Sequence, residues 1–193
     1  HEVAPGEAVA LDGLTVTGAW MDHTAPVLGY RLQEPEQPGR LDADRARALG
    51  VPEGPAMGRL KAGEAVTAED GRRVTPAEVV GPPAPGRSLV FSSDTRPCPA
   101  LTELARGADL LVHDATFTAE HTDRAAETGH SPAAPAAATA REAGVGYLYL
   151  WHFSQRYRDA ATHLSEARER FPASGASQDG LAVPLGDGDP SGV

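Results

Sequence analysis

The fold is decided by residues 88–152, which read SLVFSSDTRPCPALTELARGADLLVHDATFTAEHTDRAAETGHSPAAPAAATAREAGVGYLYLWH. Short apolar runs that are typical of strands alternate here with Ala-rich runs that are typical of helices. We predict strands at 88–92, 109–113 and 147–151 and helices at 99–105, 118–127 and 132–143. Strands that alternate with helices indicate an α/β layered unit.

The helix predicted at 132–143 carries clear end signals. We expect Ser131 at its N-cap and Pro132 at its first position, and Gly144 follows its last turn. Ser, Pro and Gly are the residues preferred at these three places.

Towards the N-terminus the pattern is less regular. Two β-like runs, 14–20 and 27–32, are separated by a short segment that contains His23. From 34 to 85 the sequence is rich in Pro, Gly and charge, with one predicted helix at 42–49. An insert of this length is usually functional or disordered.

Towards the C-terminus we predict a helix at 160–170 and a short strand at 181–184. The polar stretch 186–193 follows, and we expect it to be a disordered tail. The length of 193 residues suits one folded domain, 1–193, rather than two.

Composition excludes several classes of protein. The net charge of −10 argues against broad, non-specific binding to nucleic acid, which needs a footprint of Lys and Arg. The single cysteine, Cys98, cannot form an internal disulfide, and no run approaches the roughly 18 apolar residues that span a membrane. We therefore expect a soluble cytoplasmic protein without a membrane partner. Because the chain starts at His1 without an initiator Met, we also expect it to begin in the middle of a longer protein.

Three polar residues lie next to β-like runs: His23, Asp94 and His152. The carboxyl ends of strands are where α/β folds assemble sites, so one sheet can bring such residues together. Imidazole and carboxylate are ligands that suit Zn²⁺. The alternative is that each is an isolated polar residue at the end of a strand.

Five segments resemble motifs of the ribonuclease Z family, in the family's order, and the likeness extends from about Val3 to Pro184. They are His23 to Arg31 (its His-x-x-x-x-x-Gly-Tyr-Arg), Phe91 to Pro97 (its Gly-Asp-Thr-Arg-Pro), His113 to Phe117 (its His-Glu-Ala-Thr-Phe), Gly129 to Ser131 (its Gly-His-Ser-Thr) and His152 to Tyr157 (its His-Phe-Ser-x-Arg-Tyr).

The resemblance implies half of an αββα metallo-β-lactamase-type sandwich with an inserted arm. It implies a zinc-dependent endoribonuclease, a hydrolase that removes 3′ trailers from tRNA precursors by metal-hydroxide attack on a phosphodiester, and a homodimer. In this family His23 and His152 correspond to zinc ligands, and Asp94 to the carboxylate that bridges two zinc ions. Such a carboxylate can bind one metal through each oxygen. The ligand types also accept Mn²⁺ or Fe²⁺.

By the same resemblance His130 and Asp114 are the catalytic pair that protonates the leaving 3′-oxygen. A carboxylate bonded to an imidazole fixes its tautomer and favours the imidazolium form that a general acid requires. Arg96 and Arg156 either hold phosphate or serve as structural ion-pair partners.

The remaining histidines have ordinary interpretations. We expect His113 to be a satisfied structural residue, and His121 and His163 to be plain surface residues; His1 is uninformative.

The segment 34–85 resembles the flexible arm with which ribonuclease Z holds tRNA. Within it, Gly50 to Gly63 matches the Gly/Pro-rich tip, and Arg59 and Lys61 are its candidate substrate-binding cations. The alternative is a solvated linker, since the arm carries seven Lys and Arg against nine Asp and Glu.

The sequence departs from the family in several places. The family's His-x-His-x-Asp-His motif does not occur in it, so we expect only a half-site for the two zinc ions and an isolated chain without activity. Ser93 stands in place of Gly, Asp114 in place of Glu, Pro132 in place of Thr, and Trp151 in place of a small polar residue. Ser93 matters most if the backbone there needs a positive φ.

Two other functions remain open. The chain can be a non-catalytic, truncated or degenerate half that acts as a binding or dimerisation module, which the missing motif favours. It can also belong to another hydrolase of this fold, such as an arylsulfatase-like enzyme or a phosphodiesterase, although the tRNA-type arm counts against that.

Overall fold

The computed structural model describes residues 4–183 and 185, so the predicted tail at 186–193 lies outside the described residues. The chain divides into two compact units, His1–Glu34 with Arg87–Val193 and Pro35–Gly86. Among the described residues no helix is long and apolar enough to cross a membrane.

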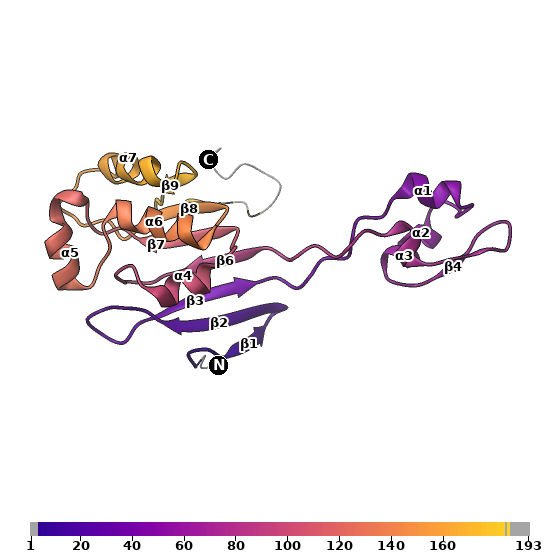
Figure 1. Ribbon diagram of the computed structural model, residues 1–193, viewed down its shortest axis with the longest axis horizontal. Coiled ribbons are helices and arrows are strands. Elements are labelled where there is room, and N and C mark those ends of the chain that lie inside the picture. Colours follow the sequence, from indigo (N-terminus) through magenta and orange to yellow (C-terminus); the bar gives the residue numbers. More distant parts are fainter. Residues whose placement is uncertain (1–3, 184, 186–193) are drawn as a thin grey trace. The chain divides into compact units, whose positions relative to one another are not determined.

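The larger unit is built on one sheet (Figure 1). In its described part the strand order is β1 (Ala8–Leu11), β2 (Leu14–Trp20), β3 (Leu28–Gln33), β6 (Ser88–Phe91), β7 (Leu110–Asp114), β8 (Tyr147–Trp151) and β9 (Ser174–Ala176). In this order β1, β2, β3 and β6 pair antiparallel with their neighbours, and β6, β7, β8 and β9 pair parallel. The carboxyl ends of β6, β7 and β8 therefore lie together at one edge.

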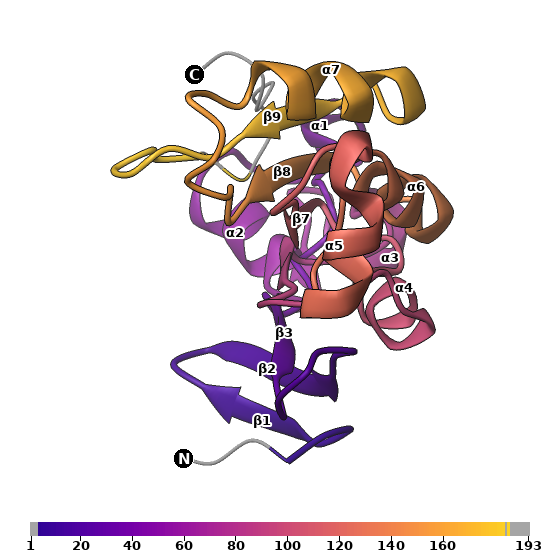
Figure 2. The ribbon, with the colours of Figure 1, turned by 90° about the vertical axis from the view of Figure 1, so that its left-hand side faces the viewer.

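Helices α4 (Pro99–Ala105), α6 (Ala133–Ala143) and α7 (Ala161–Arg170) pack on this sheet. Helix α4 contacts β2, β3 and β6, and α6 contacts β7 and β8 (Figure 2). The core between them contains Val90, Leu111 and Leu148 from the strands and a row of buried alanines from α6. Alanine favours the helix and lets it approach the sheet closely. The short helices η1 (Ala119–His121) and α5 (Thr122–Thr128) connect β7 to α6.

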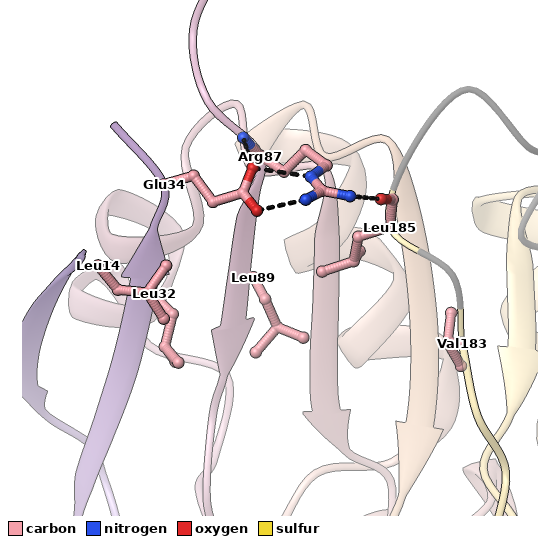
Figure 3. Close-up of a pocket in the computed structure, with 7 residues that line it drawn as sticks. All are labelled: Leu14, Leu32, Glu34, Arg87, Leu89, Val183 and Leu185. Atoms are coloured by element: carbon pink, nitrogen blue, oxygen red, sulfur yellow. Dashed lines mark hydrogen bonds and ion pairs between the residues drawn. The ribbon is translucent and has the colours of Figure 1, made fainter. Parts of the chain in front are cut away.

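Residues alternate between the two faces of the sheet along each strand, so a second set of side chains lies on the other face. This second set is also apolar. Leu110, Tyr147 and Tyr149 form a separate cluster there, and Trp20 is 53% exposed. A groove of about 300 Å³ crosses this face (Figure 3). Leu32 and Leu89 line it, and Arg87 closes one end by pairing with both carboxylate oxygens of Glu34. The described part of the larger unit contains this one sheet, so it forms one sheet-and-helix half of the expected sandwich.

The smaller unit has a hydrophobic core of its own. Residues 35–86, all of them described, contain α1 (Ala43–Ala48), α2 (Pro55–Lys61), α3 (Pro76–Val79) and the hairpin of β4 (Val66–Thr67) and β5 (Arg73–Val74). Leu60 and Val74 are completely buried in its core. A single helix is predicted from the sequence of this segment. Helix α2 is not predicted because Gly54 and Pro55 suggest a loop, whereas Pro is well tolerated in the first turn of a helix.

Most predicted elements of the larger unit are confirmed, including α4 and β8 with their full bounds. The strand predicted at 181–184 is wrong, because residues 181–183 are not in a strand, and β9 is the last strand of the part of the chain that the structure describes. The predicted N-cap of α6 is also wrong, because Pro132 occupies it. The Ser131 hydroxyl instead donates a hydrogen bond to the Thr95 carbonyl (2.7 Å), which ties the start of α6 to the loop after β6.

Candidate metal centre

Four polar side chains converge at the carboxyl ends of β6, β7 and β8. Asp94 follows β6, Asp114 ends β7, His152 follows β8, and His130 lies between α5 and α6. Each offers one ligand atom, and these atoms all lie within 4.8 Å of one another. The parallel register of β7 and β8, which pairs Asp114 with Trp151, places the last residues of both strands side by side.

His23 lies outside this group of four but beside it. Its Nδ1 donates to the Gly129 carbonyl (2.8 Å), and its ring centroid is 5.0 Å from that of His130. Gly129 has φ 85°, and a Cβ there would lie 2.6 Å from His23 Nδ1. Glycine is therefore required at 129 for both the backbone and the close approach of His23.

Asp114 is completely buried and its two oxygens are occupied. Oδ1 accepts from the backbone N–H (2.9 Å) and the hydroxyl (2.7 Å) of Thr116. Oδ2 accepts from the Thr95 N–H (3.0 Å) and from His130 Nδ1 (2.7 Å). A buried carboxylate is tolerated when hydrogen bonds replace its water. Because those bonds use both oxygens, we assign Asp114 to the support of His130 rather than to a metal.

The imidazoles of His23, His130 and His152 share one arrangement. Each Nδ1 is engaged, with the Gly129 carbonyl, the Asp114 carboxylate and the Thr116 hydroxyl (2.9 Å) respectively. A neutral imidazole that donates from Nδ1 has its free lone pair on Nε2. The hydrogen-bond partner of Nδ1 therefore decides which ring nitrogen can bind a metal. The donors considered for a metal are therefore the Nε2 nitrogens of His23 and His152 beside the half-exposed carboxylate of Asp94, a chemistry that fits Zn²⁺.

The backbone is strained on both sides of the cluster. Ser93 has φ 54° and His152 has φ 66°, in the left-handed region that non-glycine residues avoid at a cost of about 1–2 kcal/mol. The Ser93 hydroxyl donates to the Leu28 carbonyl on β3 (2.8 Å), which holds this turn in place. The position before Asp94 therefore does adopt a positive φ, with Ser instead of Gly.

The arginines near the cluster have structural partners. Arg96 donates to Asp22 Oδ1 (2.9 Å) and to the Ala126 carbonyl, so its guanidinium links the loop after β2 to helix α5. Arg156 lies with its guanidinium carbon 5.1 Å from the centroid of the Phe117 ring and bonds Ser154. In the smaller unit, Arg59 pairs with Glu64 (2.9 Å) and Lys61 is exposed at the end of α2.

His113 and His163 are both completely buried. His113 Nδ1 donates to the Asp114 carbonyl (2.9 Å), and burial lowers the pKa of His113 to about 4, in keeping with a neutral structural residue. The expectation that His113 is fully satisfied is wrong, because its buried Nε2 has no hydrogen-bond partner among the described residues. The surface prediction for His163 is wrong: its ring packs edge-on against Phe153 and Tyr157, and burial lowers its pKa.

The surface prediction for His121 is wrong too, because its Nδ1 contacts the Tyr157 hydroxyl (3.1 Å) and the residue is half-buried. For His163 a signal existed in the sequence. It lies four residues before the buried Ala167 on α7, in the spacing of one helix face.

Comparison with known proteins supports the fold. Residues 57–153 match the family model described as a β-lactamase superfamily domain. Among solved structures, the metallo-β-lactamase fold protein YhfI from Bacillus subtilis aligns over 92% of this chain and 52% of its own, with a TM-score of 0.60 and 17% identity. The short form of human tRNase Z aligns over 92% of this chain and 46% of its own, with a TM-score of 0.52 and 19% identity. At such low identity these likenesses show the fold alone.

The similarity in sequence to ribonuclease Z proteins is much higher. The Myxococcus xanthus ribonuclease Z is 51% identical over 172 residues, which is 89% of this chain and 56% of that protein. The Haloferax volcanii ribonuclease Z is 47% identical over 198 residues, which is 100% of this chain and 62% of that protein. The chain thus spans little more than half the length of these relatives. It belongs to the β-lactamase superfamily, and within that superfamily its sequence is similar to those of the ribonuclease Z proteins.

Proposed function

We propose that this chain is part of a zinc-dependent endoribonuclease that removes 3′ trailers from precursor tRNA. The observation that carries the proposal is the convergence of Asp94 and His152 beside the hydrogen-bonded pair of Asp114 and His130. Relatives of 42–51% identity that are named ribonuclease Z or ribonuclease BN point to the same reaction. Following the resemblance, we also propose a homodimer in the cytoplasm.

In this proposal the metal donors are Asp94, through its carboxylate, and His152 and His23, through Nε2. Bound zinc would supply an activated water and positive charge beside the phosphate. Two zinc ions need more ligands than these residues offer, so the chain by itself provides part of a two-metal centre and is inactive alone.

His130 is the proposed proton donor to the leaving 3′-oxygen. Its Nδ1 is held by Asp114 at 2.7 Å, so Nε2 is the nitrogen that can carry a proton to the substrate. The side chain of His130 is 15% exposed, which leaves it accessible from the site, while Asp114 is sealed from water.

The proposed substrate contacts are Arg156 at the site and Arg59 and Lys61 in the smaller unit. The contacts of Arg96 with Asp22 and Ala126 favour its structural role, so a phosphate contact there would have to replace one of them.

The experiment compares two substrates in a chimera that joins this chain to the part of the Myxococcus xanthus relative that it does not match. His130→Ala should slow cleavage of precursor tRNA about 10²–10⁴-fold, because a 3′-oxygen needs its proton on departure. Hydrolysis of a p-nitrophenyl phosphodiester should change little, since p-nitrophenolate departs without an acid.

His121→Ala is the matched control, since His121 does not touch the cluster, and it should leave both rates unchanged. Equal losses on both substrates in His130→Ala would refute its role as acid. A chimera that binds zinc but cleaves only small phosphodiesters would favour the other hydrolases of this fold, and one that binds precursor tRNA without cleaving it would favour a non-catalytic module.

A further inference from the structure

Thr116 connects two members of the cluster that the proposed function treats separately. It is buried, at 7% exposure, and lies two residues after Asp114. Its hydroxyl oxygen is 2.7 Å from Asp114 Oδ1 and 2.9 Å from His152 Nδ1. One hydroxyl thus touches both the carboxylate that supports His130 and the imidazole that we assign to zinc.

Counting protons fixes the direction of both hydrogen bonds. A threonine hydroxyl has one proton to donate and lone pairs to accept with. Asp114 Oδ1 already accepts the Thr116 N–H and is a pure acceptor, so the hydroxyl proton points to it. The hydroxyl oxygen must then accept from His152, which places the proton of that imidazole on Nδ1.

The ring of His152 has a competing partner. Asp94 Oδ1 lies 3.6 Å from His152 Nδ1, beyond a normal hydrogen bond but close enough to attract it. The backbone of His152 is strained at φ 66°, a conformation that persists only where surrounding contacts hold the residue in place. The Thr116 hydroxyl is therefore the group that keeps Nδ1 turned away from Asp94.

We infer that Thr116 is a positioning residue: its hydroxyl fixes His152 as the Nδ1–H tautomer and directs the Nε2 lone pair into the site. Asp114 then orients two imidazoles, His130 directly and His152 through Thr116. The inference rests on the proposed function for the role of Nε2, whereas the tautomer itself is a property of the metal-free chain.

The main chain around Thr116 makes a selective test possible. The Thr116 carbonyl accepts from the Ser154 N–H (3.1 Å), and the Ala115 N–H donates to the Trp151 carbonyl (2.9 Å). These backbone bonds do not involve the hydroxyl. Thr116→Val, which keeps the branched shape, should leave the strand and the loop in place.

The measurement is ¹⁵N NMR of the histidine rings in the metal-free chain above the histidine titration range, with the His152 signals assigned by their loss in His152→Asn. In the wild type and in Thr116→Ser, His152 should be a single Nδ1–H tautomer. In Thr116→Val it should become a mixture. Thr139→Val is the matched control, because Thr139 is a buried threonine whose hydroxyl donates to the Pro135 carbonyl of its own helix (3.3 Å).

Zinc titration by calorimetry gives a second reading. The dissociation constant should rise about 10–100-fold in Thr116→Val, as for other outer partners of metal-bound histidines, and Thr116→Ser should restore it. A Thr116→Val chain that keeps one Nδ1–H tautomer would overturn the inference. So would a wild-type His152 with its proton on Nε2, and this reading does not depend on how well a variant folds. A tautomer that depends on Thr116 in a chain that binds no zinc would support the inference and count instead against the proposed metal site.

Discussion

The polar groups at the carboxyl edge of β6 to β8 and those of the smaller unit are held in opposite ways. Asp114 is completely buried and each of its oxygens accepts two hydrogen bonds. The charged residues of the smaller unit form exposed ion pairs, such as Arg47 with Glu53 and Arg59 with Glu64. Exposed pairs are screened by water and contribute little, whereas a buried network is costly to disturb.

The difference separates two kinds of function. A buried network fixes side chains in one geometry, which is what proton transfer and metal binding require. Exposed cations on a separately folded unit can attract a polyanion without a fixed geometry. The smaller unit folds around Leu60 and Val74, so its surface charges are free to be used in this way.

The first way to break this comparison is to remove one carboxylate from each region. Asp114→Ala leaves buried donors of Thr95 and Thr116 without partners, so we expect a loss of about 3 kcal/mol or more in the free energy of unfolding. Glu64→Ala, which removes the exposed ion pair with Arg59, should change the free energy of unfolding little. Urea unfolding followed by far-ultraviolet circular dichroism reports both units, and tryptophan fluorescence reports the larger unit alone, since Trp20 and Trp151 both lie there. A small effect of Asp114→Ala would show that water or a local rearrangement replaces its hydrogen bonds.

A second test uses pH. Since the pKa of His113 is lowered from 6.5 to about 4, the unfolded chain takes up its proton first as the pH falls. The stability that neutral His113 contributes is complete above pH 6.5 and is lost down to about pH 4, by about 3 kcal/mol in total. His113→Leu should flatten this part of the stability curve, measured by urea unfolding at several pH values. A wild-type curve that is as flat as that of the variant would mean that His113 can be protonated in the folded state.

A third test sharpens the comparison within the cluster, at the strained turn before Asp94. Ser93→Ala keeps the positive φ of 54° but loses the bond to Leu28, so it should cost about 1 kcal/mol. Ser93→Gly loses the same bond but relieves the strain, and should be more stable than Ser93→Ala. At Ser165, exposed in the middle of α7, the order of the two substitutions should be the reverse. If the Ala variant is the more stable one at both positions, the turn at residue 93 must lose its positive φ when Ser93 is replaced.

The smallest effect is expected in the smaller unit. Deleting residues 50–63 would remove Leu60 from its core, so single substitutions are the cleaner test. In the chimera, Arg59→Ala or Lys61→Ala should raise the KM for precursor tRNA a few-fold and leave kcat and small-phosphodiester hydrolysis unchanged. Arg141→Ala, an exposed cation near the end of α6, is the charge-matched control. An equal rise in KM in Arg141→Ala would show that the effect comes from the net charge of the chain and not from a contact of Arg59 or Lys61 with the RNA.

The sequence by itself determined the α/β class, most strands and helices of the larger unit, and the motifs that hold Asp94, Asp114, His130 and His152. These depend on periodicity and end signals that act within a few residues, as for β8 and for Gly144 at the end of α6. Only the tertiary structure decided the rest: the core of residues 35–86, the burial of His163, the place of β9, and the link from Asp114 through Thr116 to His152. The reason is that these features come from contacts between segments far apart in the sequence, where burial and shared hydrogen bonds outweigh the local preference of each residue.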